Sequence, residues 1–145
     1  MLIHLNNRAL LKFSGSENEA FLQAQLSNDI SKLNEESVQI NAYCQHQGKI
    51  LALFWVIRAG DDFLLSFPLD LLDSIKARLQ MFVLMSDVTI TDVTEQYVQI
   101  GVIDESLKNS YVINEHLSLI LTNSKELSKF KFSSQVYWDK ACIDS

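Results

Sequence analysis

The feature that most constrains the fold is a run of strand-like segments between residues 38 and 67. The first segment alternates apolar with polar residues, which is the period-2 pattern of a half-buried strand. Its apolar positions are Val38, Ile40, Ala42 and Cys44. QHQGK at 45–49 then predicts a turn in which Gly48 adopts a positive φ angle. The alternation also predicts that the Cys44 thiol is buried and inert.

Two further strands follow this turn. ILALFWVIR at 50–58 is apolar on both faces, which predicts a central place in a sheet and puts Trp55 in the core. AGDD at 59–62 predicts a second turn, and DFLLSF predicts the next strand. Strands joined by such short turns pair antiparallel, so the run predicts a meander of hairpins.

Helical patterns flank the meander on both sides. Pro68 suits a helix start, and apolar residues at helical spacing predict a helix over 69–83. Upstream, ALLKF at 9–13 predicts a strand. Ser16 and Glu19 fit a capping box for a helix that ends near Leu26, and a short turn is expected from 29 to 33.

The last third of the chain predicts more strands and two short helices. The strands are VTITDV, QYVQIGVI, YVIN and LSLILT, and the helices are NSKELSKF and the tail from about residue 135. The order strand, helix, meander, helix, strands predicts an α+β fold, with helices packed on one face of an antiparallel sheet.

Composition limits the classes of function. The net charge of -6 disfavours a broad phosphate-binding surface, so we expect no direct contact with nucleic acid. The longest apolar run, at 50–57, is too short to cross a bilayer, and MLIHLNNRAL lacks the features of a signal peptide. Two distant cysteines form no metal or redox motif. These features favour a protein of the reducing cytoplasm that does not contact membranes.

Motifs of catalysis and metal binding are missing. His4, His46 and His116 lie in unrelated segments, which favours ordinary surface histidines and predicts no metal site. Two roles stay open for the side chain of Trp138, which lies in the polar stretch SSQVYWDK. It is either a core anchor or a ring at the rim of a pocket that stacks on a flat ligand.

FLQAQLSND at 21–29 resembles the FLQGQLTND-type signature of YgfZ-like proteins in the superfamily of the glycine-cleavage T-protein, the folate-binding aminomethyltransferase relatives. Further segments resemble that family in the same order: NAYCQHQGKILALFWVIRAGDDFLL, LDLLDSIKARLQMFVLMSDVTITDV and QVYWDKACIDS. The resemblance implies the N-terminal α+β folate-binding domain of a longer protein, spanning residues 1–145. The family's K-G-C-Y-x-G-Q-E motif does not occur, and Cys142 does not replace its cysteine.

The resemblance also implies a set of folate-binding residues. Gln25, Asn28 and Asp29 match the signature, with Ala24 and Ser27 in place of its Gly and Thr. Lys49 matches the hairpin turn beside Gly48, and Trp138 aligns with a tryptophan associated with the folate pocket. Arg8 stands where the family has a second aromatic. Arg8 and Lys49 are candidates to attract the glutamate tail of a folate, and the alternative is that both are simply solvated. No catalytic residue is predicted.

Three functions follow from the resemblance. The first is a YgfZ-like protein that binds a tetrahydrofolate-type ligand and supports iron–sulfur enzymes and tRNA modification, without catalysis by this chain alone. The second is a folate-dependent aminomethyltransferase, against which the strand GKILALF speaks, because Ala52 and Leu53 stand where a carboxylate is expected. The third is an interaction module that has lost its ligand. We also expect self-association of the chain through exposed apolar surface.

Overall fold

The computed structural model describes residues 1–44 and 48–144. The strands are β1 (Leu2–His4), β2 (Arg8–Ser14), β3 (Gln39–Cys44), β4 (Ile50–Ala59), β5 (Asp62–Pro68), β6 (Thr89–Asp92), β7 (Val98–Ile103), β8 (Tyr111–Val112) and β9 (Leu117–Thr122). The helices are α1 (Asn18–Gln25), α2 (Leu72–Val83) and α3 (Gln135–Asp144), with 3-10 turns η1 (Ile30–Lys32), η2 (Leu69–Leu71) and η3 (Ser124–Lys129). The predicted α+β class is confirmed.

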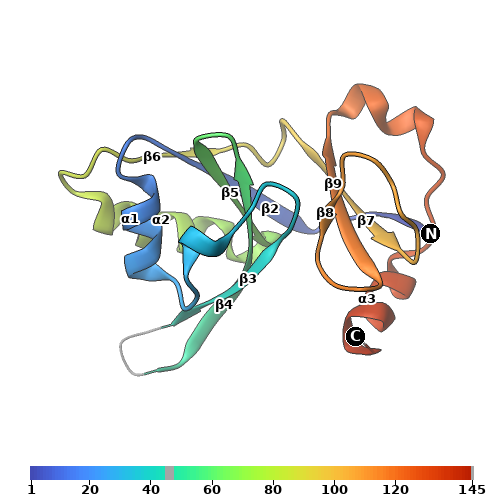
Figure 1. The fold of residues 1–145 in the computed structure, drawn as a ribbon, viewed down its shortest axis with the longest axis horizontal. Helices are drawn as coiled ribbons and strands as arrows, with labels where there is room; N and C mark the ends of the chain where they lie inside the picture. The colour runs from blue at the N-terminus through green and yellow to red at the C-terminus, as the bar shows by residue number, and fades with distance from the viewer. Residues whose placement is uncertain (45–47, 145) are drawn as a thin grey trace.

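The strands form two antiparallel sheets that lie side by side (Figure 1). The larger sheet has the order β3-β4-β5-β2-β6, and the smaller one β1-β7-β9-β8. The predicted meander is β3-β4-β5. The smaller sheet was not foreseen as a separate unit, because the strand patterns of the last third do not state which strands they pair with.

Helices α1 and α2 cover one face of the larger sheet, as predicted (Figure 1). Leu22 of α1 and Leu79 of α2 are fully buried against Phe13, Phe54 and Phe67 of the sheet. These large apolar side chains make the main core, and each contributes about 1.5–3 kcal/mol to stability through burial.

The opposite face of the larger sheet packs against the smaller sheet and α3. Leu10 and Ile57 lie in one cluster with Leu119 and Trp138. This second core joins the two sheets, and the candidate site described below lies at its margin.

Strand β3 buries the face opposite to the one predicted. Asn41 and Tyr43 are buried, whereas Ile40 and Cys44 are exposed, so the prediction of a buried Cys44 is wrong. The helix α1 covers the Asn41 face, and the register of β3 with β4 shifts between Tyr43 and Cys44. As a result the apolar face of this hairpin is left open, and Leu53 of β4 is 53% exposed although β4 is an interior strand.

The other elements differ from the predictions mainly at their ends. The helix predicted over 69–83 begins as η2 and becomes α2 at Leu72, and its apolar positions Ile75, Leu79 and Val83 are buried as expected. Gly48 and Gly60 have positive φ angles in the two turns of the meander. The middle of the predicted turn at 45–49, together with His46, lies outside the described residues.

The predicted capping box at the start of α1 is wrong. The cap residue is Glu17, without a side-chain cap hydrogen bond. Ser16 instead donates both its backbone N–H and its hydroxyl to Oδ2 of Asp87, at 3.0 and 2.7 Å. The same turn donates the Glu17 N–H to the Asp87 backbone carbonyl. The start of α1 is therefore tied to the segment before β6, a contact across the sequence that local spacing does not reveal.

Asp87 makes the stability of this corner depend on pH. The hydrogen bonds from the Ser16 side chain and backbone lower the pKa of Asp87 below its usual 3.8. The stabilisation is therefore complete above the usual pKa and is lost as the pH falls through the lowered pKa. We expect Asp87→Asn to flatten the acid limb of unfolding free energy against pH, measured by denaturant unfolding. Asp70→Asn in η2 is the control, and an unchanged acid limb in Asp87→Asn would contradict the assignment.

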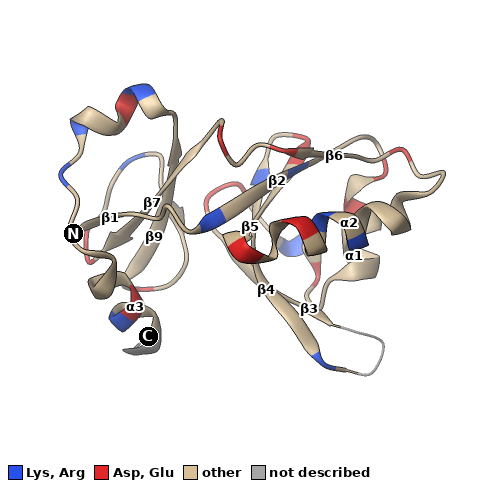
Figure 2. Ribbon diagram, turned by 180° about the vertical axis from the view of Figure 1, so that it is seen from behind, with Lys and Arg blue, Asp and Glu red and all other residues tan. Residues whose placement is uncertain are grey.

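Charged residues of both signs are scattered along the ribbon rather than gathered in one basic region (Figure 2). None of the helices in residues 1–44 and 48–144 is long and apolar enough to cross a membrane.

Candidate functional site

Arg8, Trp55 and Trp138 meet where the two sheets and α3 come together. The guanidinium carbon of Arg8 lies 3.8 Å from the centre of the Trp55 ring. Trp138 makes an edge-on contact with the Trp55 ring, and the centroids of the two rings lie 5.9 Å apart. Stacking between a guanidinium and a tryptophan contributes about 0.5–2 kcal/mol. The three side chains therefore form one connected group, in which Trp55 is held between a cation and a second indole.

Trp138 is a buried residue that supports the Trp55 ring, and it does not lie at the rim of a pocket. Its side chain is only 4% exposed, and its benzene ring lies against Gly101 of β7. A side chain larger than hydrogen at position 101 would overlap that ring. Of the two readings left open by the sequence, the core anchor is confirmed.

The guanidinium of Arg8 is only partly satisfied by the protein. Its Nε–H donates to Ser66 Oγ at 2.9 Å, whereas Nη2 is buried and has no hydrogen-bond partner among the described residues. Burial lowers the pKa of Arg8 to about 10, which still leaves the group charged at neutral pH. A buried cationic donor without an acceptor costs about 1–3 kcal/mol. Nη2 of Arg8 therefore has hydrogen bonds left to donate to an anionic or carbonyl oxygen of a ligand.

A mainly apolar cavity of about 450 Å³ opens beside Arg8 and Trp55. Its wall combines the open face of the β3–β4 hairpin with the β8–β9 turn and α3. The lining residues are Arg8, Ile40, Leu53, Trp55, Pro68, Ile113, Asn114, Leu117 and Cys142. The volume lies within the range of small-molecule sites, and one cation in an apolar setting is the usual polarity of such sites.

Cys142 of α3 also lines this cavity. Burial raises the pKa of its thiol, the carboxylate of Asp139 raises it further, and Arg8 opposes both. A thiol with a raised pKa is mostly protonated at neutral pH and is a weak nucleophile. Cys142 is therefore part of the cavity wall.

The polar residues Ser27, Asn28 and Asp29 hold the chain against the edge of β3. Asn28 donates its backbone N–H to Asn41 Oδ1 at 2.7 Å and its side-chain amide to the Ile40 carbonyl. Ser27 Oγ accepts the Ala42 N–H at 2.9 Å. Asp29 caps η1 by accepting from Ser31, and the Ser31 hydroxyl lowers the pKa of Asp29. This segment therefore satisfies backbone groups of an edge strand.

The six predicted folate-binding residues do not come together in one site. Arg8 and Trp138 come together in the Trp55 group, whereas Asn28 and Asp29 lie at the outer edge of β3. Gln25 is the half-buried last residue of α1, and Lys49 is exposed at the end of the β3–β4 hairpin. Of the six, Arg8 lines the 450 Å³ cavity, and the other five are not among its lining residues.

Sequence reasoning missed Trp55 and Ser66 as parts of the site. Trp55 was assigned to the core because its strand is apolar on both faces. Trp55 lines the cavity because one face of β4 is partly open to solvent, and the apolar sequence of the strand does not indicate which face that is. An isolated Ser in the apolar run DFLLSF was the available signal for Ser66, because a buried hydroxyl needs a partner.

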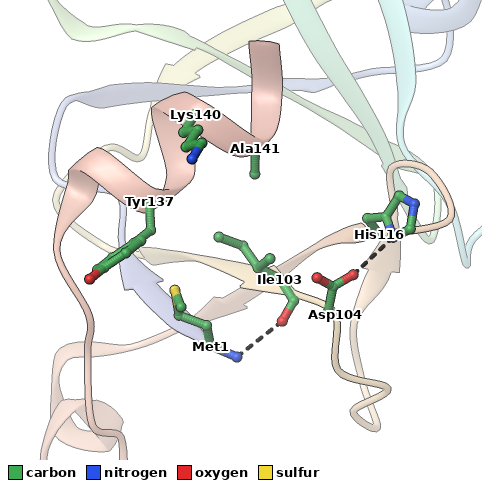
Figure 3. A pocket seen from close by; sticks show the side chains of 7 residues that line it. All are labelled: Met1, Ile103, Asp104, His116, Tyr137, Lys140 and Ala141. Atoms are coloured by element: carbon green, nitrogen blue, oxygen red, sulfur yellow. Dashed lines mark hydrogen bonds and ion pairs between the residues drawn. The ribbon is translucent and has the colours of Figure 1, made fainter. Parts of the chain in front are cut away.

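A second cavity of about 310 Å³ lies between α3 and the ends of β1 and β7 (Figure 3). It is lined by Met1, Ile103, Asp104, His116, Tyr137, Lys140 and Ala141. His116 Nδ1 lies 2.9 Å from Asp104 Oδ1, and both side chains are more than 60% exposed. Such an exposed pair contributes at most about 1 kcal/mol. His116 therefore lies at the surface, as predicted. We place the candidate site at the Arg8 cavity, because a buried cationic donor there has no hydrogen-bond partner among the described residues.

Within the described part of the chain, no three His, Cys, Asp or Glu side chains come close enough together to hold a metal ion.

The fold is that of the aminomethyltransferase class. The chain matches the crystal structure of the glycine cleavage system aminomethyltransferase T from Bartonella henselae with a TM-score of 0.70. The match covers 88% of this chain and 44% of that protein, at 13% sequence identity, and it shows a shared fold.

The sequence is similar to YgfZ. The tRNA-modifying protein YgfZ of Colwellia psychrerythraea is 26% identical over 136 residues, which are 94% of this chain and 41% of that protein. The YgfZ of Enterobacter sp. is 31% identical over 101 residues, covering 70% of this chain and 31% of that protein. The aminomethyltransferase of Exiguobacterium sibiricum is 34% identical over 113 residues, covering 77% and 31%.

The predicted resemblance is therefore confirmed for YgfZ-like and aminomethyltransferase proteins. The chain spans less than half of the length of each of these relatives. No family model matches it.

Proposed function

We propose that this chain binds a tetrahydrofolate-type ligand in the Arg8 cavity. The observation that carries the proposal is the buried Nη2 of Arg8, which faces no protein acceptor beside an indole that a flat ring can contact. A folate carries a flat bicyclic ring with a carbonyl oxygen and an acidic tail. An arginine is well suited to bind either a carbonyl or a carboxylate, and it binds a carboxylate with two parallel hydrogen bonds.

The rest of the cavity suits the aromatic middle of such a ligand. Ile40 and Leu53 offer apolar surface that is otherwise exposed to water. Covering such surface contributes about 25 cal/mol for each Å² removed from water. The likeness to aminomethyltransferases and YgfZ supports a folate over other flat anions.

The proposal predicts that Arg8→Met removes binding without harming the fold. The chain's two tryptophans, Trp55 and Trp138, both belong to the site, so their fluorescence reports on a titration with tetrahydrofolate or its 5-formyl form. We expect saturable quenching in the wild type and an affinity at least about tenfold lower in Arg8→Met, because a hydrogen bond to a charged group is lost. The free energy of unfolding should fall by no more than about 1 kcal/mol, because the change also removes a buried unsatisfied donor.

Arg58→Met is the matched control. Arg58 also lies over an aromatic ring, at 5.2 Å from Phe63, but it is not part of the cavity wall and pairs with Glu19. Equal loss of binding in both variants, or no fluorescence response of the wild type at millimolar ligand, would contradict the proposal. The second result would favour the third function considered above, an interaction module that has lost its ligand.

We extend the proposal to the cellular role implied by YgfZ. In its ligand-bound form, the chain supports iron–sulfur enzymes and tRNA modification. The YgfZ relatives are named as tRNA-modifying proteins, which supports this extension. Cells that lack the chain should lose activity of such enzymes, and the wild-type gene but not Arg8→Met should restore it.

The second candidate function is that of an aminomethyltransferase, which the 34% identity to the Exiguobacterium sibiricum protein favours. The lining of the Arg8 cavity speaks against it, because the lining residues given above include no carboxylate to assist transfer. A glycine-cleavage assay with the partner lipoyl protein distinguishes the two, and turnover would favour the enzyme.

We also propose that the chain associates with itself. Met81, Phe82, Leu84 and Met85 are exposed together at the end of α2, and Met85 is fully exposed. Contiguous apolar surface of this kind is typical of interaction sites. Light scattering should show a mass above that of the monomer at high concentration, and Met81→Lys with Met85→Lys should lower it. Val136→Lys, at an exposed position on α3, is the control, and a strictly monomeric wild type would contradict this proposal.

A further inference from the structure

Three side chains from three strands form a hydrogen-bonded chain that ends at the candidate site. Gln99 of β7 and Ser66 of β5 are both buried, and they connect the smaller sheet with the larger one. The Ser66 hydroxyl donates to Gln99 Oε1 and accepts from Arg8 Nε. Each of these groups has its polar atoms within the protein core, where an unpaired hydroxyl or amide would cost about 1–3 kcal/mol.

The contacts of the Gln99 amide determine which atom donates in each of these hydrogen bonds. The Gln99 amide nitrogen is directed at two backbone carbonyls of β2, those of Arg8 at 3.4 Å and Ala9 at 3.3 Å. Its amide oxygen therefore faces Ser66, because the two ends of an amide cannot exchange roles here without placing oxygen against oxygen. The Ser66 proton is used for Gln99, so a lone pair of the hydroxyl is left for the Arg8 guanidinium.

This arrangement determines where Arg8 points. The Ser66 bond fixes Nε, and the Trp55 ring fixes the plane of the guanidinium at 3.8 Å. With both constraints, Nη2 is held buried and without a protein acceptor. If Ser66 turned its proton towards the cation, the side chain of Arg8 would lose its anchor and be free to adopt other rotamers.

We propose that Gln99 is a positioning residue for ligand recognition, which acts through Ser66 to hold Arg8 over Trp55. The inference rests on the proposed function for its ligand and on the hydrogen-bonded chain for its geometry. A residue of the smaller sheet thereby controls the affinity of a site whose polar contact comes from the larger sheet.

The experiment uses the N–H signals of arginine side chains in NMR. The sequence contains only three arginines, at positions 8, 58 and 78, so each Nε–H signal can be assigned by substitution. In the ligand-free wild type, we expect slow hydrogen exchange at Arg8 Nε. Gln99→Met and Ser66→Ala should each accelerate this exchange at least about tenfold, and the double variant should add nothing, because the two residues act as one unit.

Asn41→Leu is the matched control. Asn41 of β3 is a fully buried amide in the larger sheet, but it forms hydrogen bonds with Asn28 and Gln39 instead of the Arg8 group. It should lower stability without changing exchange at Arg8 Nε. Arg58 Nε serves as the internal reference in every variant.

Ligand affinity gives the second readout. Gln99→Met should weaken 5-formyltetrahydrofolate at least about tenfold, in parallel with the exchange rate. If Gln99→Met only lowers stability and leaves Arg8 Nε–H protected, or leaves the affinity of a binding wild type unchanged, the inference is wrong. If the wild type binds no folate at all, the proposed function fails, while the exchange rates still decide whether Gln99 positions Arg8.

Discussion

Replacing Gly15 with alanine should destabilise the protein by about 3–5 kcal/mol. Gly15 has a φ angle of +106°, and a Cβ at this position would lie 2.2 Å from the Asp87 carbonyl oxygen. That oxygen belongs to the backbone segment that also receives the Glu17 N–H, so it cannot move without breaking the start of α1. The overlap and the strained φ angle add together, and the loss is a large part of the 5–15 kcal/mol typical of a whole domain.

Gly60→Ala separates the two causes. Gly60 also has a positive φ angle, +63°, but nothing lies within 4 Å of an added Cβ. It should therefore cost only the backbone strain, about 1–2 kcal/mol. Denaturant unfolding of both variants measures the difference. Equal losses in Gly15→Ala and Gly60→Ala would show that the close approach of Gly15 to Asp87 does not contribute.

Gly101→Ala should cost about 2–3 kcal/mol and should also disturb the candidate site. An added Cβ would lie 2.5 Å from two ring carbons of Trp138, which is buried and has no free space in which to retreat. Because Trp138 contacts the edge of Trp55, we expect the near-UV circular dichroism of the tryptophans to change together with stability.

The partner of Gly101 can be tested by a double-mutant cycle. Trp138→Leu alone should be destabilising, because it removes a buried ring. Added to Trp138→Leu, the Gly101→Ala change should cost much less than it does in the wild type, which gives a coupling free energy of about 1–2 kcal/mol. Strict additivity of the two changes would mean that the cost of Gly101→Ala has another source.

Local patterns predicted most of the secondary structure, because period and turn chemistry act over short stretches of chain. The helix at 69–83 and the meander at 38–67 are examples, and both occur with shifts of a few residues. The errors arose where distant contacts decide. Ser16 contacts Asp87 rather than capping α1, and β3 turns Tyr43 instead of Ile40 towards the core because α1 covers that face.

The candidate site was only partly predictable for the same reason. Arg8 was marked by its place in the family resemblance, but its neighbour Trp55 comes from a strand some fifty residues further along and was read as core. Trp55 is an aromatic neighbour of Arg8 that the family resemblance does not mark. By contrast, Asn28 and Asp29 match the family signature, but Asn28 is hydrogen-bonded to the edge of β3 and the Asp29 side chain caps η1.

The central claim is that a folate-type ligand binds in the cavity that Arg8 and Trp55 line. The most direct measurement is a titration of the isotope-labelled chain with 5-formyltetrahydrofolate, followed through the backbone amide, indole N–H and arginine Nε–H signals. We predict saturable shifts that are largest at the Trp55 indole and Arg8 Nε, with Arg58 Nε unchanged. Saturable shifts confined to residues 25–29 or to the cavity of His116 would contradict this placement, and the absence of any saturable shift would contradict ligand binding itself.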